Sequence, residues 1–236
     1  MKKICHEIRT VGTMPLPINK FEILDLGMVL YKGVVEDPKK IIDTVESLEL
    51  RLASENPEHT SVKPWTPWQN ESAGTFETFC LQKFIEQPQN IRQDDMFYDE
   101  QMYVSQELFG ALDVALKHYT TELYPFAEKN IKSREHTMHL LRYDEAGYLP
   151  AHQDQGVSSR VLSVLLYLND DYEGGEITFR HSNITMKPEP GSILFFPSNF
   201  LYVHEIAPVT KGPRYALPNW YHNIPTELKR NSTGEE

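Results

Sequence analysis

Short apolar runs separated by turn residues dominate the second half of the chain. Between His136 and Tyr221 these runs are punctuated by Gly, Pro, Asn and Asp, which is the pattern of β-strands joined by turns. The predicted strands cover residues 136–143, 160–168, 176–181, 192–196 and 214–221. Regular short strands of this kind favour a sandwich or a barrel.

The first half of the chain has a helical pattern instead. Asp37 is a typical N-cap and Pro38 a typical first helical residue, and an apolar stripe follows at Ile41, Ile42, Val45, Leu48 and Leu52. A second helix is predicted over residues 99–124, with Leu108, Leu112, Ala115, Leu116, Tyr119 and Leu123 at helical spacing. Both stripes are interpreted as packing surfaces.

Two segments of the first half lack helical periodicity. Residues 21–31 are apolar enough to be read as one strand. Residues 54–75 contain three prolines and a glycine around Trp65 and Trp68, so we expect a loop there. Because a long aromatic loop is unusual, the two tryptophans either pack against the body of the protein or form part of a substrate rim.

We expect a single domain over residues 1–230. The strand and supporting helices would lie in residues 18–130 and a β-rich core in residues 136–222, with a disordered polar tail at 231–236. Since no Gly/Ser-rich or Pro-rich linker separates the two parts near residue 130, the better prediction is an α+β domain with helices packed on one face of the β-core.

Composition excludes several classes of protein. The formal charge of −11 and the pI near 5.3 argue against a uniformly basic nucleic-acid-binding surface. Cys5 and Cys80 are far apart and suggest neither a disulfide framework nor a zinc site. With no apolar leader and no apolar stretch long enough to span a membrane, we expect a cytoplasmic, soluble protein without a membrane partner.

The candidate chemistry lies in three side chains of the β-rich half. His152 and Asp154 are two residues apart, and His204 follows about fifty positions later. In an extended strand His152 and Asp154 would point to the same side, and two imidazoles with one carboxylate are the ligands of mononuclear non-haem Fe(II) sites. The alternative is that the triplet arises by chance in a chain with nine histidines, and that His204 is a surface or hydrogen-bonded core residue.

Arg214 is a candidate anchor for an anionic ligand. A guanidinium binds a carboxylate through a bidentate fork, as a dicarboxylic co-substrate would require. On the predicted strand, Arg214, Ala216, Pro218 and Trp220 share one face, so small residues beside the arginine leave space and the tryptophan closes the end. The other reading of Arg214 is an exposed charge at the end of a strand.

Seven segments in this order resemble the 2-oxoglutarate- and Fe(II)-dependent dioxygenases, specifically their prolyl 4-hydroxylase-like branch. The matching segments are residues 140–148, 152–154, 161–169, 173–179, 190–196, 203–205 and 214–220. The resemblance implies a double-stranded β-helix (jelly-roll, cupin-like) core with N-terminal supporting helices. Residues 1–130 match the family only loosely, as helical support in front of that core.

The resemblance also implies roles for individual residues. It makes His152, Asp154 and His204 the iron ligands and Arg214 the anchor of the far carboxylate of 2-oxoglutarate. Tyrosines that contact the same carboxylate in similar enzymes correspond to Tyr143 and Tyr167, for which the alternative is ordinary core packing. The expected substrate pocket comprises Trp220, Tyr148, Trp65 and Trp68.

The activity implied by the resemblance is hydroxylation of an unactivated C–H bond, with release of succinate and CO2. The expected substrate is a prolyl or other amino-acid residue of a peptide or protein, or a small amino acid. Fe(II), 2-oxoglutarate and O2 are the implied cofactor and co-substrates, with ascorbate as a candidate reductant. The alternatives are a small-molecule or nucleobase oxygenase and a non-catalytic jelly-roll binding protein, and the oligomeric state stays open.

Overall fold

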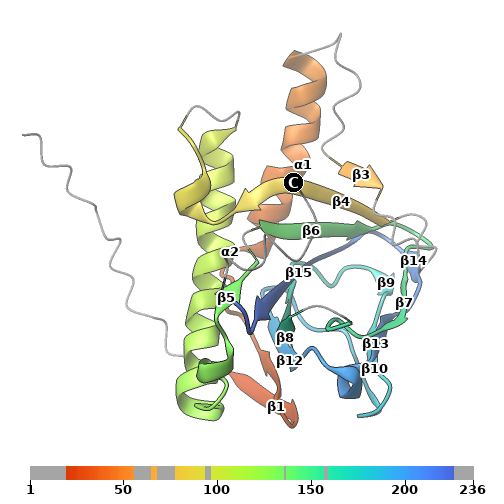
Figure 1. Cartoon of the computed structure of the whole chain (residues 1–236). Helices are drawn as coiled ribbons and strands as arrows, with labels where there is room; N and C mark the ends of the chain where they lie inside the picture. Colours follow the sequence, from red (N-terminus) through yellow and green to blue (C-terminus); the bar gives the residue numbers. More distant parts are fainter. Residues whose placement is uncertain are drawn as a thin grey trace, which may run out of the picture.

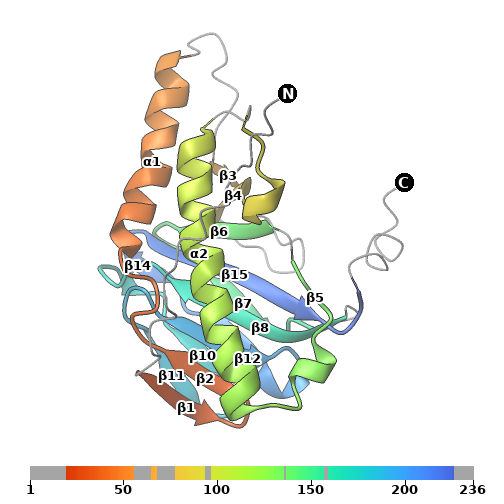
Figure 2. The same ribbon diagram turned by 90° about the vertical axis from the view of Figure 1, so that its left-hand side faces the viewer.

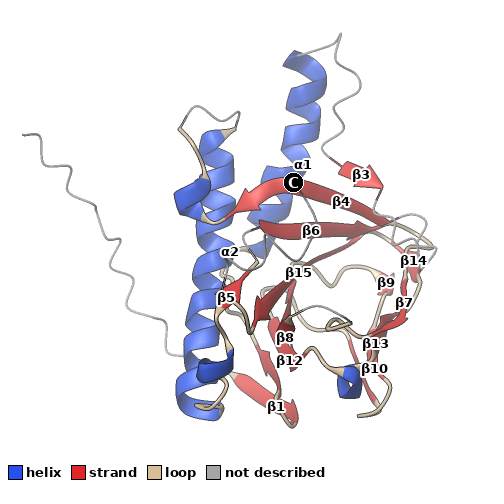
Figure 3. Ribbon diagram, viewed as in Figure 1, coloured by secondary structure: helices blue, strands red, loops and turns tan. Residues whose placement is uncertain are grey.

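The computed structural model describes residues 20–55, 65–67, 78–93, 97–135, 137–156 and 159–225. This part contains three sheets (Figures 1 and 3). The nine-stranded sheet has the order β1 (Phe21–Asp25), β2 (Met28–Tyr31), β12 (Ile193–Pro197), β8 (Arg160–Tyr167), β15 (Arg214–His222), β6 (Thr137–Tyr143), β4 (Thr78–Glu86) and β3 (Trp65–Pro67), and β5 (Ser133–Arg134) also pairs with β15.

The second sheet is smaller and carries part of the candidate site. It has the order β11 (Ile184–Met186), β10 (Ile177–Phe179), β13 (His204–Ile206) and β7 (Leu149–His152). A two-stranded sheet pairs β14 (Val209–Lys211) with β9 (Glu173–Gly174). The helical elements are α1 (Pro38–Glu55), α2 (Tyr98–His118), a π-helical turn (Tyr119–Leu123) and 3₁₀ turns at Pro88–Asn90, Glu128–Asn130 and Phe200–Tyr202.

The two faces of the nine-stranded sheet are covered differently. Helices α1 and α2 lie on one face, and the four-stranded sheet lies on the other (Figures 1 and 2). One buried cluster joins Ile41 of α1 and Leu108 of α2 to Leu217 of β15. A second joins Leu141 of β6 to Ile206 of β13. The cavity described below therefore lies between two sheets, on the face away from the helices.

The helix predicted to begin at Asp37 and Pro38 is confirmed as α1. The Oδ1 atom of Asp37 accepts a hydrogen bond from the backbone N–H of Lys40 at 3.0 Å, which is the N-cap interaction expected of this residue. The predicted stripe is buried at Ile41, Val45 and Leu48, while Ile42 is half-buried. The side chain of Leu52 lies outside the part of the chain that the structure describes.

The second predicted helix is also confirmed, with a change near its end. The α-helix stops at His118, and a π-helical turn covers Tyr119–Leu123. In this last stretch the hydroxyls of Thr120 and Thr121 donate to the carbonyls of Leu116 and Lys117 at 2.9 and 2.8 Å. Side chains of this kind compete with the backbone for the helical carbonyls, which suits an irregular helix end.

Two predictions for the first half were wrong. Residues 21–31 form a hairpin of two strands and not one, because Gly27 takes a φ of +76° and turns the chain so that Phe21 pairs with Tyr31. The loop predicted over 54–75 contains strand β3 at Trp65–Pro67, which pairs with β4. Strand β4 itself was not predicted.

No helix in the described part of the chain is both long enough and apolar enough to cross a membrane.

Candidate metal centre and co-substrate pocket

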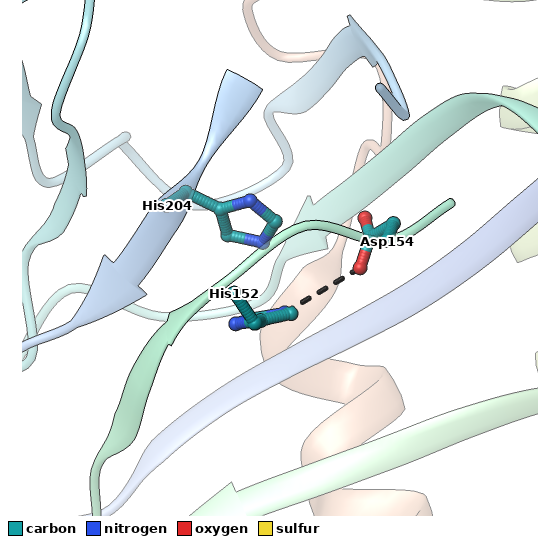
Figure 4. Close-up of side chains that lie close together, drawn as sticks. All are labelled: His152, Asp154 and His204. Atoms are coloured by element: carbon teal, nitrogen blue, oxygen red, sulfur yellow. Dashed lines mark ion pairs between the residues drawn. The ribbon is translucent and has the colours of Figure 1, made fainter. Parts of the chain in front are cut away.

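The structure brings His152, Asp154 and His204 together. Each offers one ligand atom, and these atoms all lie within 4.8 Å of one another (Figure 4). His204 is paired with His152 across β13 and β7, and their ring centroids are 4.3 Å apart. Two imidazoles and a carboxylate at this spacing fit one divalent transition-metal ion. Of the two alternatives for His204, the surface histidine is excluded because its side chain is buried.

Asp154 is not held by a strand, contrary to the expectation. Strand β7 ends at His152, and Asp154 lies in a bend two residues later. Its Oδ1 is 3.4 Å from Nε2 of His152. The carboxylate therefore faces the imidazoles because the chain bends after the strand, and not because of strand alternation.

Backbone carbonyls determine which nitrogen of each imidazole is free. Nδ1 of His152 lies 2.9 Å from the carbonyl of Pro150, and Nδ1 of His204 lies 3.1 Å from the carbonyl of Tyr202. A carbonyl can only accept, so both Nδ1 atoms must carry the proton. In the neutral rings both Nε2 atoms then have a free lone pair, which is what a metal ion requires.

The protonation of Asp154 and His204 also suits a metal ion. Burial holds the pKa of His204 below its ordinary value. Burial tends to raise the pKa of Asp154, but the hydrogen bond from His152 and the charge of His204 outweigh it and hold that pKa well below its ordinary range. For His152, burial is outweighed by Asp154, and the net pKa is raised. Asp154 is thus an anionic ligand before any ion is bound.

A buried pair of serine hydroxyls lies behind the carboxylate. Ser163 of β8 hydrogen-bonds to Asp154 and lies 2.8 Å from the hydroxyl of Ser198. Both serines are almost fully buried. Sequence reasoning missed this pair, although Ser163 stands out as a small polar residue inside the apolar run of β8.

One cavity connects the triad to Arg214. The predicted face of β15 is confirmed as its wall, because Arg214, Ala216, Pro218 and Trp220 all line it. The other described lining residues outside the triad are Leu141, Tyr143, Leu149, Val164, Leu165 and Ile206. Apart from the triad and Arg214 the wall is largely apolar, so a polar ligand would be oriented at its two ends.

Arg214 is a buried cation with unused hydrogen-bonding capacity. Its side chain is 1% exposed, which excludes the reading as an exposed strand-end charge. Its Nε and Nη2 atoms have no hydrogen-bond partner among the described residues. Because a buried, unpaired guanidinium is costly, this end of the cavity fits the carboxylate of a bound ligand. 2-Oxoglutarate meets this requirement, because it has a 2-oxo acid group that can chelate a metal and a second carboxylate at its other end.

The two expected tyrosines both lie close to the guanidinium. The centroid of the Tyr143 ring is 4.9 Å from Cζ of Arg214, and that of Tyr167 is 5.4 Å away. Tyr143 lines the cavity, and the hydroxyl of Tyr167 is buried without a hydrogen-bond partner in the described part of the chain. Both rings can stabilise the cation through their π faces.

Of the expected substrate-pocket residues that the structure describes, Trp220 alone is found on the cavity wall. Trp65 packs against the body of the protein, as one alternative had it, and does not belong to the substrate pocket: it is 3% exposed and lies in the core against Tyr215, beneath the guanidinium of Arg142. Strand β3 places it in the nine-stranded sheet and not in a loop at the rim. Tyr148 is half-buried just before β7 and does not line the cavity, and Trp68 lies outside the described residues.

Comparison with known proteins agrees with this geometry. Residues 138–222 match the family model of the 2OG-Fe(II) oxygenase superfamily, where 2OG is 2-oxoglutarate. Residues 138–222 belong to that superfamily. This oxygenase segment includes all three residues of the triad and Arg214, and it begins inside β6 and ends with β15.

Relatives of the oxygenase segment include hydroxylases. The chain is 37% identical over 83 residues to prolyl 3-hydroxylase 2 of Homo sapiens, a match that covers 32% of this chain and 12% of that protein. It is 32% identical over 90 residues to a PKHD-type hydroxylase of Idiomarina loihiensis, covering 35% of this chain and 40% of that protein. The chain thus spans well under half the length of either relative.

The fold extends beyond the oxygenase segment. A prolyl hydroxylase from Trichoplax adhaerens, solved in complex with a hypoxia inducible factor oxygen degradation domain peptide fragment, superposes with a TM-score of 0.60. The two share 17% sequence identity, and the match covers 89% of this chain and 88% of that one. The predicted fold class, a double-stranded β-helix with supporting helices, is therefore confirmed.

Proposed function

We propose that this chain is an Fe(II)- and 2-oxoglutarate-dependent dioxygenase that hydroxylates an unactivated C–H bond and releases succinate and CO2. The observation that carries the proposal is one cavity with two chemically different ends. At one end is the His152, Asp154 and His204 triad, and at the other is the buried, unpaired guanidinium of Arg214. A metal-chelating dicarboxylic acid is a ligand that satisfies both ends.

Each end has a defined task in this proposal. His152, Asp154 and His204 hold Fe(II) through three protein ligands, and Arg214 holds the far carboxylate so that the 2-oxo acid group is directed at the metal. When bound, Fe(II) and 2-oxoglutarate supply the oxidising power for C–H hydroxylation. The apolar residues between the ends, such as Leu141 and Leu165, limit the access of water.

For the substrate we propose a prolyl, or other amino-acid, residue of a peptide or protein. Two features support this class: the hydroxylase relatives, and Trp220 beside Pro218 on the cavity wall, where the guanidinium of Arg160 covers one face of the tryptophan ring at 3.7 Å from its centroid. A tryptophan face packs well against a compact apolar ring. The net charge of −11 disfavours the nucleobase alternative, because a nucleic acid would need a basic groove along its phosphates.

The test of the activity is succinate release from 2-oxoglutarate in the presence of Fe(II), with ascorbate as the reductant. The expected result is turnover by the wild-type protein and its loss in His152→Ala. His181→Ala is the matched control, because His181 is an exposed histidine outside the cavity and its loss should leave turnover intact. Turnover that survives in His152→Ala, or none in the wild type, would refute the proposal.

The substrate is tested separately by mass spectrometry of peptides incubated with the protein. A gain of one oxygen atom on prolyl residues that depends on 2-oxoglutarate is the expected result. Oxygen gained only by free small molecules or nucleobases would favour the alternative oxygenases. A cytoplasmic location and a domain covering residues 1–230 stay predictions.

A further inference from the structure

Tyr172, which no prediction included, lies against the side chain of Arg214. It precedes strand β9 and is 2% exposed. Gly175 marks where the two side chains meet: a Cβ atom there would lie 3.0 Å from Cδ of Arg214 and 3.0 Å from Cε2 of Tyr172. Gly175 has a φ of +67°, which glycine adopts readily, and it has no Cβ atom that would press on both side chains.

The hydroxyl of Tyr172 is buried and has unused hydrogen-bonding capacity. It has no hydrogen-bond partner among the described residues, as is also true of the Tyr167 hydroxyl and of Nε and Nη2 of Arg214. Burial raises the pKa of Tyr172, although the charge of Arg214 and the polar contact between its guanidinium and the phenol act in the opposite direction. The phenol therefore keeps its proton at neutral pH and can donate it in a hydrogen bond.

The ammonium group of Lys187 contacts both the backbone and the ring of Tyr172. Its Nζ donates to the backbone carbonyl of Tyr172 at 3.0 Å and to that of Asp170 at 3.2 Å. The same Nζ lies 5.0 Å from the centroid of the Tyr172 ring. These contacts hold the backbone and the ring, but they leave the hydroxyl without a partner. Its orientation beside Arg214 is thus set before a ligand arrives.

We propose that the Tyr172 hydroxyl is a further co-substrate-binding group, which donates a hydrogen bond to the carboxylate held by Arg214. A carboxylate accepts at about four lone-pair positions. The cluster offers four buried donors without partners, namely Nε and Nη2 of Arg214 and the hydroxyls of Tyr167 and Tyr172. A bound carboxylate would supply acceptors for these donor atoms, which have no partner among the described residues. This inference rests on the proposed function.

The test separates the two ends of the ligand. Protein loaded with Mn(II) as a redox-stable substitute for Fe(II) is titrated calorimetrically with N-oxalylglycine, a 2-oxoglutarate analogue with both carboxylates, and with oxalate, which has only the metal-chelating end. Tyr172→Phe removes one hydrogen bond to a charged group, so its affinity for N-oxalylglycine should fall about tenfold or more. Its affinity for oxalate should not change.

Tyr215→Phe is the matched control. Tyr215 is adjacent to Arg214 on β15 but points to the helix side, where its hydroxyl donates to Oε1 of Glu46 at 2.8 Å. This variant should bind both ligands as the wild type does. It shows whether the loss of any buried phenol hydroxyl near Arg214 is enough to weaken binding.

Three outcomes overturn the inference. If Tyr172→Phe binds N-oxalylglycine as tightly as the wild type, the hydroxyl makes no contact with the carboxylate. If it weakens oxalate equally, Tyr172 acts on the metal end or on the fold. If the metal-loaded wild type binds neither ligand, the proposed function fails together with the inference, whereas the first two outcomes leave the proposed function standing.

Discussion

At the scale of single residues, the buried guanidinium of Arg214 lowers the stability of the ligand-free protein but provides a binding group for an anion. A guanidinium that is 1% exposed and lacks partners on two nitrogens destabilises the protein that holds it. The two nearby aromatic rings, those of Tyr143 and Tyr167, offset only part of that cost. A bound anion would offset the remaining cost by pairing with the guanidinium.

Replacement of Arg214 by an apolar side chain should therefore separate the two properties. Arg214→Met is expected to raise the free energy of unfolding of the ligand-free protein by about 1 kcal/mol or more, because a buried unpaired charge is removed. The same variant should lose about 100-fold in affinity for 2-oxoglutarate, since a bidentate pair of charged hydrogen bonds is lost. Urea denaturation and calorimetric titration measure the two effects. A variant that is both less stable and unchanged in affinity would contradict this account of the pocket.

Residue identity and spacing were enough to predict part of the candidate site. The spacing of His152 and Asp154, the later His204 and the alternation around Arg214 pointed to the groups that the structure brings together. Tyr172 and the Ser163–Ser198 pair could not be found this way. Tyr172 is one of twelve tyrosines, and its position beside Arg214 depends on a turn through Gly175 that no local pattern specifies.

At the scale of elements, two glycines show that the effect of a glycine-to-alanine substitution depends on backbone conformation and on tertiary packing. Gly110 is in α2, and a Cβ added there would meet no atom within 4 Å. Gly175 has a positive φ and a Cβ there would press on Arg214 and Tyr172. The same substitution should therefore have opposite effects at the two positions.

Gly110→Ala should stabilise the protein by about 0.5–1 kcal/mol, because alanine favours the helix and loses less backbone entropy. Gly175→Ala should destabilise it by about 1 kcal/mol or more and weaken the binding of 2-oxoglutarate as well, because the new methyl group displaces the anchor. Thermal unfolding with and without the ligand checks both. If Gly175→Ala were as stable as the wild type and bound 2-oxoglutarate normally, the close packing at this turn would be disproved.

Regular elements were predictable where the hydrophobic periodicity was clear, as for α1, α2 and β15. The errors arose where one residue redirects the chain. Gly27 converts the apolar segment 21–31 into a hairpin, and the bend after His152 takes Asp154 out of its strand. Strand β4 was missed because it lies beyond a proline-rich segment and is recognised mainly by its pairing with β6, which is a long-range property.

At the scale of the whole molecule, the sheets and helices bury many phenols on both sides of the nine-stranded sheet. Burial raises the pKa of Tyr31, Tyr119, Tyr167, Tyr215 and Tyr221 well above the ordinary value of tyrosine. The unfolded chain would release these protons near pH ~10, whereas the folded protein keeps them. Ionisation therefore favours the unfolded state as the pH rises.

Stability should consequently be unaffected by these groups below pH ~10 and should fall progressively above it. Denaturant titrations at a series of alkaline pH values measure the effect, and ultraviolet absorbance reports the ionisation of the phenols. The expected result is that a fraction of the tyrosines ionises only as the protein unfolds. Full ionisation at the ordinary pKa with the fold intact would show that these side chains are not buried.

The α+β class and a jelly-roll core could be expected from the order of segments, but the sheet partners could not. Local periodicity does not state that β15 lies between β8 and β6, or that β13 pairs with β7 and so places His204 beside His152. Those contacts join residues about 50 to 75 positions apart, and they depend on the packing of both sheets.

The most direct test of the central claim is absorption spectroscopy of the Fe(II)-loaded protein under anaerobic conditions. Chelation of ferrous iron by a 2-oxo acid produces a charge-transfer band in the visible range. The wild type and His181→Ala should develop this band on addition of 2-oxoglutarate, His152→Ala and His204→Ala should not, and Arg214→Met should require far more ligand. Failure of the wild type to develop the band, or its persistence without the two histidines, would contradict the account.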